Sequence, residues 1–360
     1  MSLAQPKRIL IIKLRHHGDV LLSTPVVDAL KTRFPDCEID MLVYAGTGQL
    51  IADNPQIAQI FTIDRNWKKL GVFKQLACEK NLLSKLKARD YDWAFNLSDQ
   101  WRAAVIAKLC ARCSVGLDCI KRDGFWWRFC HDFINHELDT SHHIVENQLN
   151  ILAPLIQPED VADAKVRLWV AQDARESMRQ KLREQGWGGE DYVLLHPGAR
   201  WHFKCWEDGK NAAIVQLLLN SGQNVVLTAS PDTVEQYMLQ EIIGRLNIPE
   251  GGKIWVLSGC LSLRELAAAI EGAKLFVGVD SAPMHIAAAL DKPQIALFGA
   301  SWVDKWRPYS EQAEVIYAGD YAELPHPDSI DTNDPTRLLK AIPLQDVWDR
   351  ISAKLEALEA

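Results

Sequence analysis

The 360-residue chain lacks any run of about 20 consecutive apolar residues, the length that a membrane-spanning helix needs. Its start, MSLAQPKRILIIKL, passes from a short polar stretch directly into a strand-like run, which is not the pattern of a secretory signal. Hydrophobic residues make up 48% of the chain and charged residues 24%, as is typical of a soluble globular protein. We therefore expect a cytoplasmic protein.

Glycine-rich phosphate loops are also missing. No G-x-G-x-x-G follows any expected strand, and no G-x-x-x-x-G-K-[ST] occurs, which argues against NAD-linked and NTP-hydrolysing enzymes. No basic stripe suggests a nucleic-acid partner. Residues 1–170 carry 22 basic and 20 acidic side chains, whereas residues 171–360 carry 18 and 27. The first half is therefore the better candidate to meet an acidic partner or an anionic membrane surface.

A complete zinc motif is absent as well. Four of the eight cysteines cluster and His131 follows them, but there is only one C-x-x-C pair, formed by Cys110 and Cys113. Zinc sites of this kind need a second pair. We favour reduced thiols that pack as small apolar residues over a zinc site, and we expect no metal.

Short runs rich in branched residues alternate with helical patterns along the chain. This alternation predicts parallel sheets covered by helices on both faces. The expected strands of the first half are 8–14, 38–44, 57–63, 92–97 and 114–117, and its expected helices are 20–34, 47–53, 72–89 and 100–112. In the second half, strands are expected at 192–198, 224–230, 254–259, 275–280 and 294–299, and helices at 172–185, 207–221, 231–245, 262–272 and 283–290.

The rhythm restarts after a proline-containing acidic stretch near residue 160, which indicates two doubly wound α/β domains. We place an acceptor-type domain at 1–165 and a ligand-binding domain at 166–342, with a natural ligand site in the cleft between their sheets. A final helix covers 343–360. The sequence does not set its direction, so it is free to pack back on the N-terminal domain.

The stretch LFVGVDSAPMHIAAALDKPQIALFGAS, residues 275–301, is the most informative. A strand ends in Asp280, and Ser281 opens a helix that has Pro283 in its first turn. Unpaired N–H groups at such a helix start bind anions, and a diphosphate fits that chemistry. In the alternative interpretation, Asp280 and Ser281 only cap the helix and His285 only packs in its second turn.

Two further loops favour the ligand site. HPGARWHFKCW, residues 196–206, places Arg200 and Lys204 after the second domain's first strand, at the sheet edge where parallel topology also puts Asp280. LTASPDTVEQ, residues 227–236, brings Asp232 and Glu235 to the same edge. These carboxylates would either accept from ribose hydroxyls or form a helix cap, and we weigh both alternatives equally.

KLRHHGDVLLSTPVVDALK (13–31), HPGARWHFKCW and VGVDSAPMHIAAALDKPQIALFGAS, in this order and spacing, resemble the lipopolysaccharide heptosyltransferase family. The likeness spans residues 7 to about 350. It implies a GT-B fold, with two Rossmann-like domains facing across a cleft. It also implies an inverting glycosyltransferase that moves heptose from ADP-heptose to the inner core of lipopolysaccharide, without a required metal, at the cytoplasmic face of the inner membrane. Another transferase of the family, a sugar-nucleotide 2-epimerase of the same fold and a non-catalytic nucleotide-sugar-binding protein are the alternatives.

The resemblance also assigns roles to residues. Asp19 matches the catalytic aspartate and Lys204 the lysine on the donor phosphates. The donor site takes Arg200, Asp232 on the ribose, the backbone of Leu261 on adenine, and the D-[ST]-x-x-x-H signature formed by Asp280, Ser281, Ala282 and His285. Asp19, ionised at pH 7 with an ordinary carboxylate pKa, would accept the proton of the attacking hydroxyl.

The acceptor is expected on the first domain. Gly18 would let it approach the backbone, and His16 and His17 either tune acceptor choice or pack against the loop. Basic candidates for an anionic glycolipid or the membrane surface are Lys13, Arg15, Arg102, Lys121 and Arg122. GFWWRF, residues 124–129, adds aromatic character, although a solvated surface with core tryptophans is the simpler interpretation.

Overall fold

The computed structural model describes residues 5–118, 122, 124–161 and 163–359. The chain divides into two compact units, Met1–Trp169 and Val170–Ala360, so the boundary lies four residues after the expected one. Within the described part, no helix is both long enough and apolar enough to cross a membrane.

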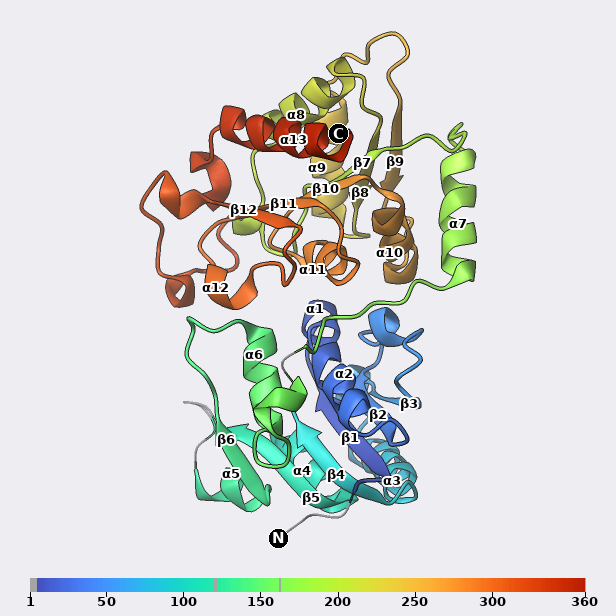
Figure 1. Cartoon of the computed structure of the whole chain (residues 1–360), viewed down its shortest axis with the longest axis vertical. Helices are drawn as coiled ribbons and strands as arrows, with labels where there is room; N and C mark the ends of the chain where they lie inside the picture. Colours follow the sequence, from blue (N-terminus) through green and yellow to red (C-terminus); the bar gives the residue numbers. More distant parts are fainter. Residues whose placement is uncertain (1–4, 119–121, 123, 162, 360) are drawn as a thin grey trace. The chain divides into compact units, whose positions relative to one another are not determined.

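Unit 1 is built on a six-stranded parallel sheet with the strand order β3-β2-β1-β4-β5-β6 (Figure 1). Its central strands are rich in branched and aromatic residues because helices cover both faces, and Ile9 to Ile12 are completely buried. The strands are β1 (Arg8–Lys13), β2 (Glu38–Tyr44), β3 (Gln59–Ile63), β4 (Tyr91–Asn96), β5 (Ala111–Asp118) and β6 (Phe133–His136).

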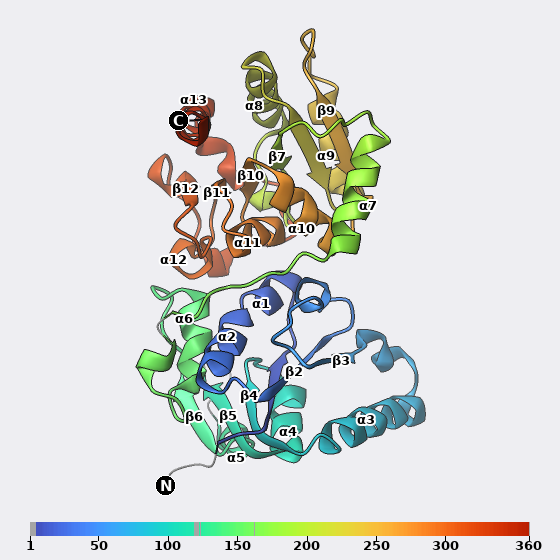
Figure 2. The same ribbon diagram turned by 45° about the vertical axis from the view of Figure 1, so that its right-hand side comes forward.

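Each face of this sheet has its own apolar core. α1 and α2 contribute to one core and α3 and α4 to the other (Figure 2). The helices are α1 (His17–Leu21), α2 (Thr24–Arg33), α3 (Val72–Lys87), α4 (Trp101–Cys110), α5 (Phe125–Phe129) and α6 (Ile144–Leu149), with 3₁₀ turns η1 (Gln49–Ile51), η2 (Arg65–Lys69), η3 (Asn150–Leu152) and η4 (Pro158–Val161).

Unit 2 contains a second six-stranded parallel sheet, with the order β12-β11-β10-β7-β8-β9. Its strands are β7 (Val193–His196), β8 (Val225–Ala229), β9 (Ile254–Ser258), β10 (Leu275–Val279), β11 (Gln294–Phe298) and β12 (Ala313–Tyr317). Its helices are α7 (Gln172–Arg183), α8 (Asp208–Asn220), α9 (Thr233–Ile243), α10 (Leu263–Gly272), α11 (Ala282–Ala289), α12 (Val303–Trp306) and α13 (Leu344–Glu359). Short 3₁₀ turns complete the unit: η5 (His202–Lys204), η6 (Ala318–Asp320), η7 (Pro327–Ser329) and η8 (Leu338–Ala341).

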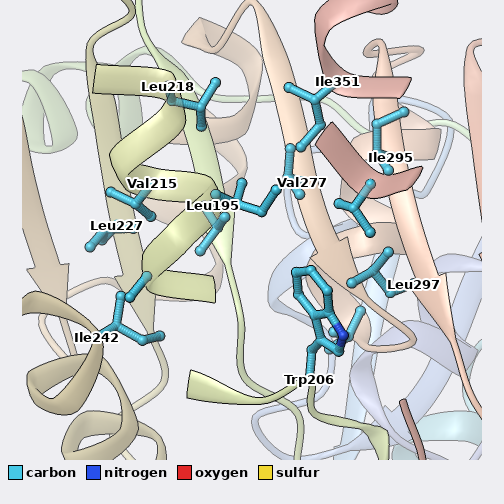
Figure 3. Packing of buried hydrophobic residues seen from close by; sticks show 14 of the residues in the cluster. Leu195, Trp206, Val215, Leu218, Leu227, Ile242, Val277, Ile295, Leu297 and Ile351 are labelled. Carbon is cyan, nitrogen blue, oxygen red and sulfur yellow. The ribbon is translucent and has the colours of Figure 1, made fainter. Parts of the chain in front are cut away.

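The C-terminal helix belongs to the core of unit 2. Val347, Ile351 and Leu355, spaced four residues apart on one side of α13, are buried in the cluster that also holds Leu218 of α8 and Val277 of β10 (Figure 3). Whether residues 343–360 also pack back on the N-terminal domain stays a prediction. An amphipathic helix buries its apolar stripe where a sheet face is still open.

The strand orders set where ligands can bind. In each sheet the order reverses beside the unit's first strand, so β1 lies between β2 and β4, and β7 lies between β8 and β10. Loops that leave neighbouring strands in opposite directions open a crevice at the carboxyl ends, which is the usual ligand position in such sheets. The loops after β1 and β7 carry the motifs that the sequence singles out.

The single C-x-x-C pair does not form a site. Cys110 ends α4 in one core of unit 1, whereas Cys113 belongs to β5 and the opposite core. Burial raises the pKa of both thiols to about 11, so both are neutral thiols at pH 7. No group of His, Cys, Asp or Glu side chains among the described residues is arranged to hold a metal ion, and Cys119 lies outside them.

Candidate active site

Lys204 and Asp280 meet at the switch point of unit 2. Lys204 ends η5 in the loop after β7, and Asp280 follows β10 directly. The Lys204 Nζ donates to Asp280 Oδ2 at 2.5 Å, and the two side chains are 15% and 7% exposed. The prediction that parallel topology brings these two loops together is confirmed.

Aromatic rings support the lysine. Its ammonium lies 5.1 Å from the ring centre of Trp201 and 6.0 Å from that of Phe203, and the two rings stack on each other. Arg200 is exposed, with its guanidinium carbon 5.8 Å from the Trp201 ring centre. The loop therefore holds one positive charge firmly beside Asp280 and a second one nearer to solvent.

The start of α11 has an unused hydroxyl. Ser281 is the N-cap residue, yet its side chain makes no capping bond, and its buried Oγ has no hydrogen-bond partner. In the first turn, Pro283 has no N–H and the Met284 N–H donates to the Ser281 carbonyl at 3.2 Å, so the Ala282 N–H is the one left without a partner within the helix. The predicted capping alternative for the Ser281 side chain is thus wrong. A buried hydroxyl with no hydrogen-bond partner, next to the Ala282 N–H, suits an anionic ligand.

His285 lies in the second turn of α11 and is 6% exposed. Its imidazole is buried within the helix layer, as the packing alternative expects. A direct role toward a ligand stays a prediction.

The loop after β8 is organised by two carboxylates with different tasks. Asp232 is exposed and caps α9, since its Oδ1 accepts from the Val234 N–H at 2.8 Å. Glu235 is 7% exposed and accepts from the Ser230 N–H at 3.0 Å. The capping alternative for Asp232 is therefore observed, and its predicted contact with ribose remains a prediction.

Glu235 also reaches the β7 loop. Its Oε2 lies 3.7 Å from His196 Nε2, and His196 Nδ1 is 2.9 Å from the Thr228 hydroxyl. Burial lowers the pKa of His196, although the Glu235 charge opposes this effect. A Cβ at Gly198 would lie 2.5 Å from Glu235 Oε2, so a larger residue there would require the Glu235 side chain to shift. The buried Glu235 carboxylate therefore packs against both His196 and Gly198 of the HPG motif.

Leu261 lies half-buried in the short loop between β9 and α10. Gly259, two residues earlier, adopts a φ of +64°, and its N–H donates to the Ala229 carbonyl at 2.9 Å. The loop leaves the carboxyl end of β9, at the same sheet edge as the loop after β8. The backbone contact of Leu261 with adenine stays a prediction.

The amino-terminal motif forms α1. His16 is the N-cap residue, and His17, Gly18 and Asp19 make up the first turn. Asp19 is half-buried, at the positive end of this short helix. His17 Nδ1 is buried without a hydrogen-bond partner, and burial, followed by the nearby His16 and Arg65 charges, lowers the His17 pKa. The helix starts three residues earlier than the predicted 20–34 pattern, which also spans α2.

Lys13 is buried beneath this helix. It is 4% exposed, and its Nζ donates to the Leu97 carbonyl at 3.2 Å. Burial lowers the pKa of Lys13 to about 8, and the negative charge of Asp19 is the largest effect in the opposite direction. Lys13 is therefore a buried side chain whose charged form is favoured by the nearby Asp19 carboxylate. It is not the surface contact that the sequence suggested.

A basic cavity of about 290 Å³ lies at the switch point of unit 1. Three of the predicted acceptor-side residues line it, namely Arg15, His16 and Arg102. Sequence reasoning missed the others. The remaining lining residues are Leu14, Tyr44, Arg65, Lys68 and Gln100.

Polar contacts fix the walls of this cavity. The Arg65 guanidinium stacks 4.1 Å from the Tyr44 ring centre, and the Tyr44 hydroxyl donates to Gln100. Arg15 pairs with Asp99 at 3.1 Å, and Arg102 pairs with Glu79. Four cationic side chains thus converge on one cavity, and the acids that pair with two of them do not line it. Such a cavity suits an anionic group.

The remaining predicted basic residues are placed differently. Arg122 donates to the Asp99 carbonyl at 2.8 Å, and its guanidinium lies 5.8 Å from the Trp101 ring centre. Lys121 lies outside the described residues.

Comparison with known proteins agrees with this arrangement. The family model for glycosyltransferase family 9 (heptosyltransferase) matches residues 80–336. Lipopolysaccharide heptosyltransferase 3 of Escherichia coli is 37% identical over 335 residues, which cover 93% of this chain and 95% of that protein.

Two solved structures share the fold. The crystal structure of a family 9 glycosyl transferase from Veillonella parvula has a TM-score of 0.83 at 21% identity and covers 99% of both chains. The structure of the Escherichia coli ADP-heptose lipopolysaccharide heptosyltransferase II has a TM-score of 0.78 at 22% identity and covers 98% of this chain and 100% of that one. The predicted fold class, two doubly wound parallel-sheet domains of the GT-B type, is confirmed, and the chain belongs to glycosyltransferase family 9, the heptosyltransferase family.

Proposed function

We propose that this enzyme transfers heptose from ADP-heptose to the inner core of lipopolysaccharide, as the third heptose onto the second, with inversion at the anomeric carbon. The observation that carries the proposal is the anion site of unit 2, where Lys204, Asp280 and the start of α11 meet at the switch point. The names of its relatives, a lipopolysaccharide heptosyltransferase 3 and an ADP-heptose heptosyltransferase, supply the sugar and the acceptor.

The donor's diphosphate would bind at the α11 start. The Ser281 hydroxyl and the Ala282 N–H would donate to phosphate oxygens, and Lys204 would neutralise the charge that develops as ADP leaves. These groups supply the positive charge that a divalent metal provides in other transferases, so we propose that no metal is needed. Asp280 would hold the lysine in position through their 2.5 Å bond.

Asp19 would act as the general base. An inverting displacement needs a carboxylate that removes the proton of the attacking hydroxyl while the sugar–phosphate bond breaks. Asp19 sits in the first turn of α1, directly after the loop whose residues line the basic cavity of unit 1. Lys13, buried beneath, would help to keep this carboxylate in place by charge.

The basic cavity would receive the acceptor. The resemblance implies an inner core that carries phosphate, and Arg15, Arg65, Lys68 and Arg102 converge where such an anionic group would bind. Because this acceptor is a glycolipid, we propose that the enzyme works as a peripheral protein on the cytoplasmic face of the inner membrane.

The proposal is tested by incubating the enzyme with ADP-heptose and a core acceptor that ends in the second heptose, followed by mass spectrometry. We expect one added heptose of inverted anomeric configuration, also after treatment with a metal chelator. Product formed from ADP-heptose without acceptor would indicate an epimerase instead.

Replacing the base separates catalysis from binding. Asp19→Asn should lower transfer by about 100- to 10,000-fold, the usual contribution of a general base, while ADP affinity stays within a few fold. Asp36→Asn, which neutralises an exposed carboxylate of the same unit, is the matched control and should leave both unchanged. Near-normal turnover of Asp19→Asn would contradict the assignment.

A further inference from the structure

The amino-terminal end of α3 exposes an unusual apolar surface on unit 1. Phe73 is 89% exposed, Val72 70%, Leu76 58% and Leu70 44%. Val72, Phe73 and Leu76 occupy one side of the first turns of the helix, whereas Leu82 and Leu86, further along, are buried in the core. The helix is thus anchored at its far end and presents apolar side chains to solvent at its start.

The same segment is strongly basic. Residues 65–76, RNWKKLGVFKQL, contain four basic side chains and no acidic one. Lys68, Lys69 and Lys74 are exposed and flank the apolar residues, and Lys80 is exposed one turn beyond Leu76 on the same side of the helix. An apolar tip edged by lysines is the composition of interfacial membrane anchors, in which the lysines reach the anionic headgroups.

α4 lies between α3 and α5 in unit 1, and α5 carries a second group of exposed apolar side chains (Figure 1). Arg102 of α4 pairs with Glu79 of α3, and the Trp101 ring of α4 packs edge-on against Trp127 of α5 at 5.5 Å. On α5 the aromatic side chains that point away from the core are again exposed: Phe125 by 73%, Trp126 by 68% and Phe129 by 62%. Tryptophan and phenylalanine are favoured at membrane interfaces.

The basic cavity adjoins the exposed apolar residues at the start of α3. Arg65 and Lys68 of η2 line the cavity, and the apolar residues start two positions after Lys68, at Leu70. A glycolipid that places its anionic sugar in the cavity would therefore have its membrane next to Leu70 and α3.

We propose that the exposed apolar end of α3, with Lys69 and Lys74 beside it, inserts into the headgroup region of an anionic phospholipid membrane and presents the basic cavity to a membrane-borne acceptor. The choice of acceptor rests on the proposed function. Attachment to the membrane rests only on the exposed side chains and their charges.

The test is co-sedimentation of the full chain with vesicles that contain no acceptor. We expect binding to vesicles of phosphatidylethanolamine and phosphatidylglycerol, and much weaker binding to phosphatidylcholine. Val72→Ser with Phe73→Ser should weaken binding to the anionic vesicles by about tenfold or more, because both side chains lose their apolar contact with the membrane. Lys69→Gln with Lys74→Gln should weaken it by about fivefold for each lysine and reduce its salt dependence.

Unit 2 offers a matched control. Val234 and Tyr237 on α9 are 57% and 63% exposed, but α9 contains no basic residue. Val234→Ser with Tyr237→Ser removes similar exposed apolar area and should leave vesicle binding unchanged. Equal losses for the α3 and α9 variants, or no binding of the unmodified enzyme to anionic vesicles, would overturn the proposal. It would also fail if the unmodified enzyme sediments as a dimer that the α3 variant splits, since a second copy would then cover the surface.

A second readout separates this inference from the proposed reaction. With a lipid-free core oligosaccharide as acceptor, Val72→Ser with Phe73→Ser should transfer heptose as fast as the unmodified enzyme. If the unmodified enzyme binds vesicles but transfers no heptose, the proposed function is contradicted, whereas the inference that α3 binds the membrane is supported. Normal vesicle binding by the Val72→Ser, Phe73→Ser variant would contradict the inference that α3 binds the membrane, but not the proposed function.

Discussion

At the scale of single residues, the ion pair formed by Lys204 and Asp280 allows its effect on stability to be separated from its proposed role in donor binding. Both side chains are largely buried, so Lys204→Met leaves the Asp280 carboxylate without its partner. Breaking a buried pair in this way typically costs roughly 3 to 5 kcal/mol. We expect Lys204→Met to lower the urea midpoint of unit 2 and to weaken ADP binding strongly.

The double variant Lys204→Met, Asp280→Asn distinguishes the two effects. It removes both charges, so most of the lost stability should return, while ADP binding measured by calorimetry stays weak because the positive charge is still missing. Recovery of ADP affinity together with stability would mean that Lys204 acts only in folding.

Gly198 is a second residue whose replacement has a defined steric result. A methyl group there would lie 2.5 Å from Glu235 Oε2 and force the buried carboxylate away from the Ser230 N–H. We expect Gly198→Ala to destabilise the protein by about 1 to 3 kcal/mol in urea titrations. Gly209→Ala in α8, where the new Cβ meets open space, is the control and should be neutral or stabilising. Equal midpoints for the two variants would contradict this account.

Sequence reasoning placed three of its candidate residues in segments that follow central strands of the two sheets. Lys204, Asp280 and Asp19 come from loops after β7, β10 and β1, whose apolar runs are easy to recognise. It missed Tyr44 and Arg65, although both occur at the carboxyl ends of β2 and β3. Their position was a usable signal. Their convergence depends on the strand order, which a single sequence does not give.

At the scale of elements, two serines that begin neighbouring helices of unit 2 have opposite roles. Ser262 forms a capping box with Glu265 at the start of α10, whereas Ser281 makes no capping bond at the start of α11. We expect Ser262→Ala to cost about 1 kcal/mol of stability and to leave heptose transfer unchanged. Ser281→Ala should leave the melting temperature unchanged or higher and weaken ADP binding several-fold. A fall in melting temperature for Ser281→Ala without any change in ADP binding would assign Ser281 to the fold alone.

The elements that the sequence did not reveal share a physical cause. β6 and β12 are edge strands, and none of the side chains of β6 is fully buried, so neither strand shows a continuous apolar run. α5 has five residues and α6 has six, too few for a helical period to emerge. Buried strands were predicted to within a few residues because their continuous apolar runs are easy to recognise. β2, predicted at 38–44, spans Glu38–Tyr44.

At the scale of the whole molecule, the repeated pattern of strands and helices was sufficient to predict two doubly wound units, since burial of parallel strands on both faces leaves a clear sequence record. The charge asymmetry also has a structural counterpart. The modest excess of basic residues in the first half becomes a local concentration in unit 1, at the basic cavity and at the start of α3. The net charge of the first half does not reveal this concentration of basic residues, because acidic residues elsewhere in unit 1 offset most of the positive charge.

Buried histidines make the stability of the molecule sensitive to mild acid. His131 is 6% exposed, and its neutral form satisfies both neighbours: Nδ1–H donates to the Trp127 carbonyl at 3.0 Å, and Nε2 accepts from Asn96 at 3.2 Å. Burial lowers the pKa of His131 in unit 1 and of His196 in unit 2. A second proton on His131 would place its Nε2–H against the Asn96 amide donor.

The sign of the pH dependence follows from these lowered pKa values. The unfolded chain takes up protons on its histidines near pH 6.5, whereas the folded protein does so only at lower pH. The histidine contribution to stability is thus fully present above pH 6.5 and is lost as the pH falls through the lower folded-state pKa values, by at most about 1.4 kcal/mol per pH unit for each proton. Carboxylates with lowered pKa values, such as Glu265 with a pKa of about 2, also contribute to stability. Their contribution is lost only when the pH falls below about 4.5, the ordinary pKa of a glutamate.

We therefore expect the free energy of unfolding, measured in urea, to fall between pH 7.5 and pH 5.5, before any carboxylate effect begins. His131→Gln removes one of the responsible groups and keeps an amide that can hydrogen-bond. Whatever its stability at pH 7.5, this variant should lose less stability than the unmodified protein over the same pH interval, because one proton fewer is taken up on unfolding. Equal losses for the two proteins would show that His131 is already protonated in the fold, which its two hydrogen bonds argue against.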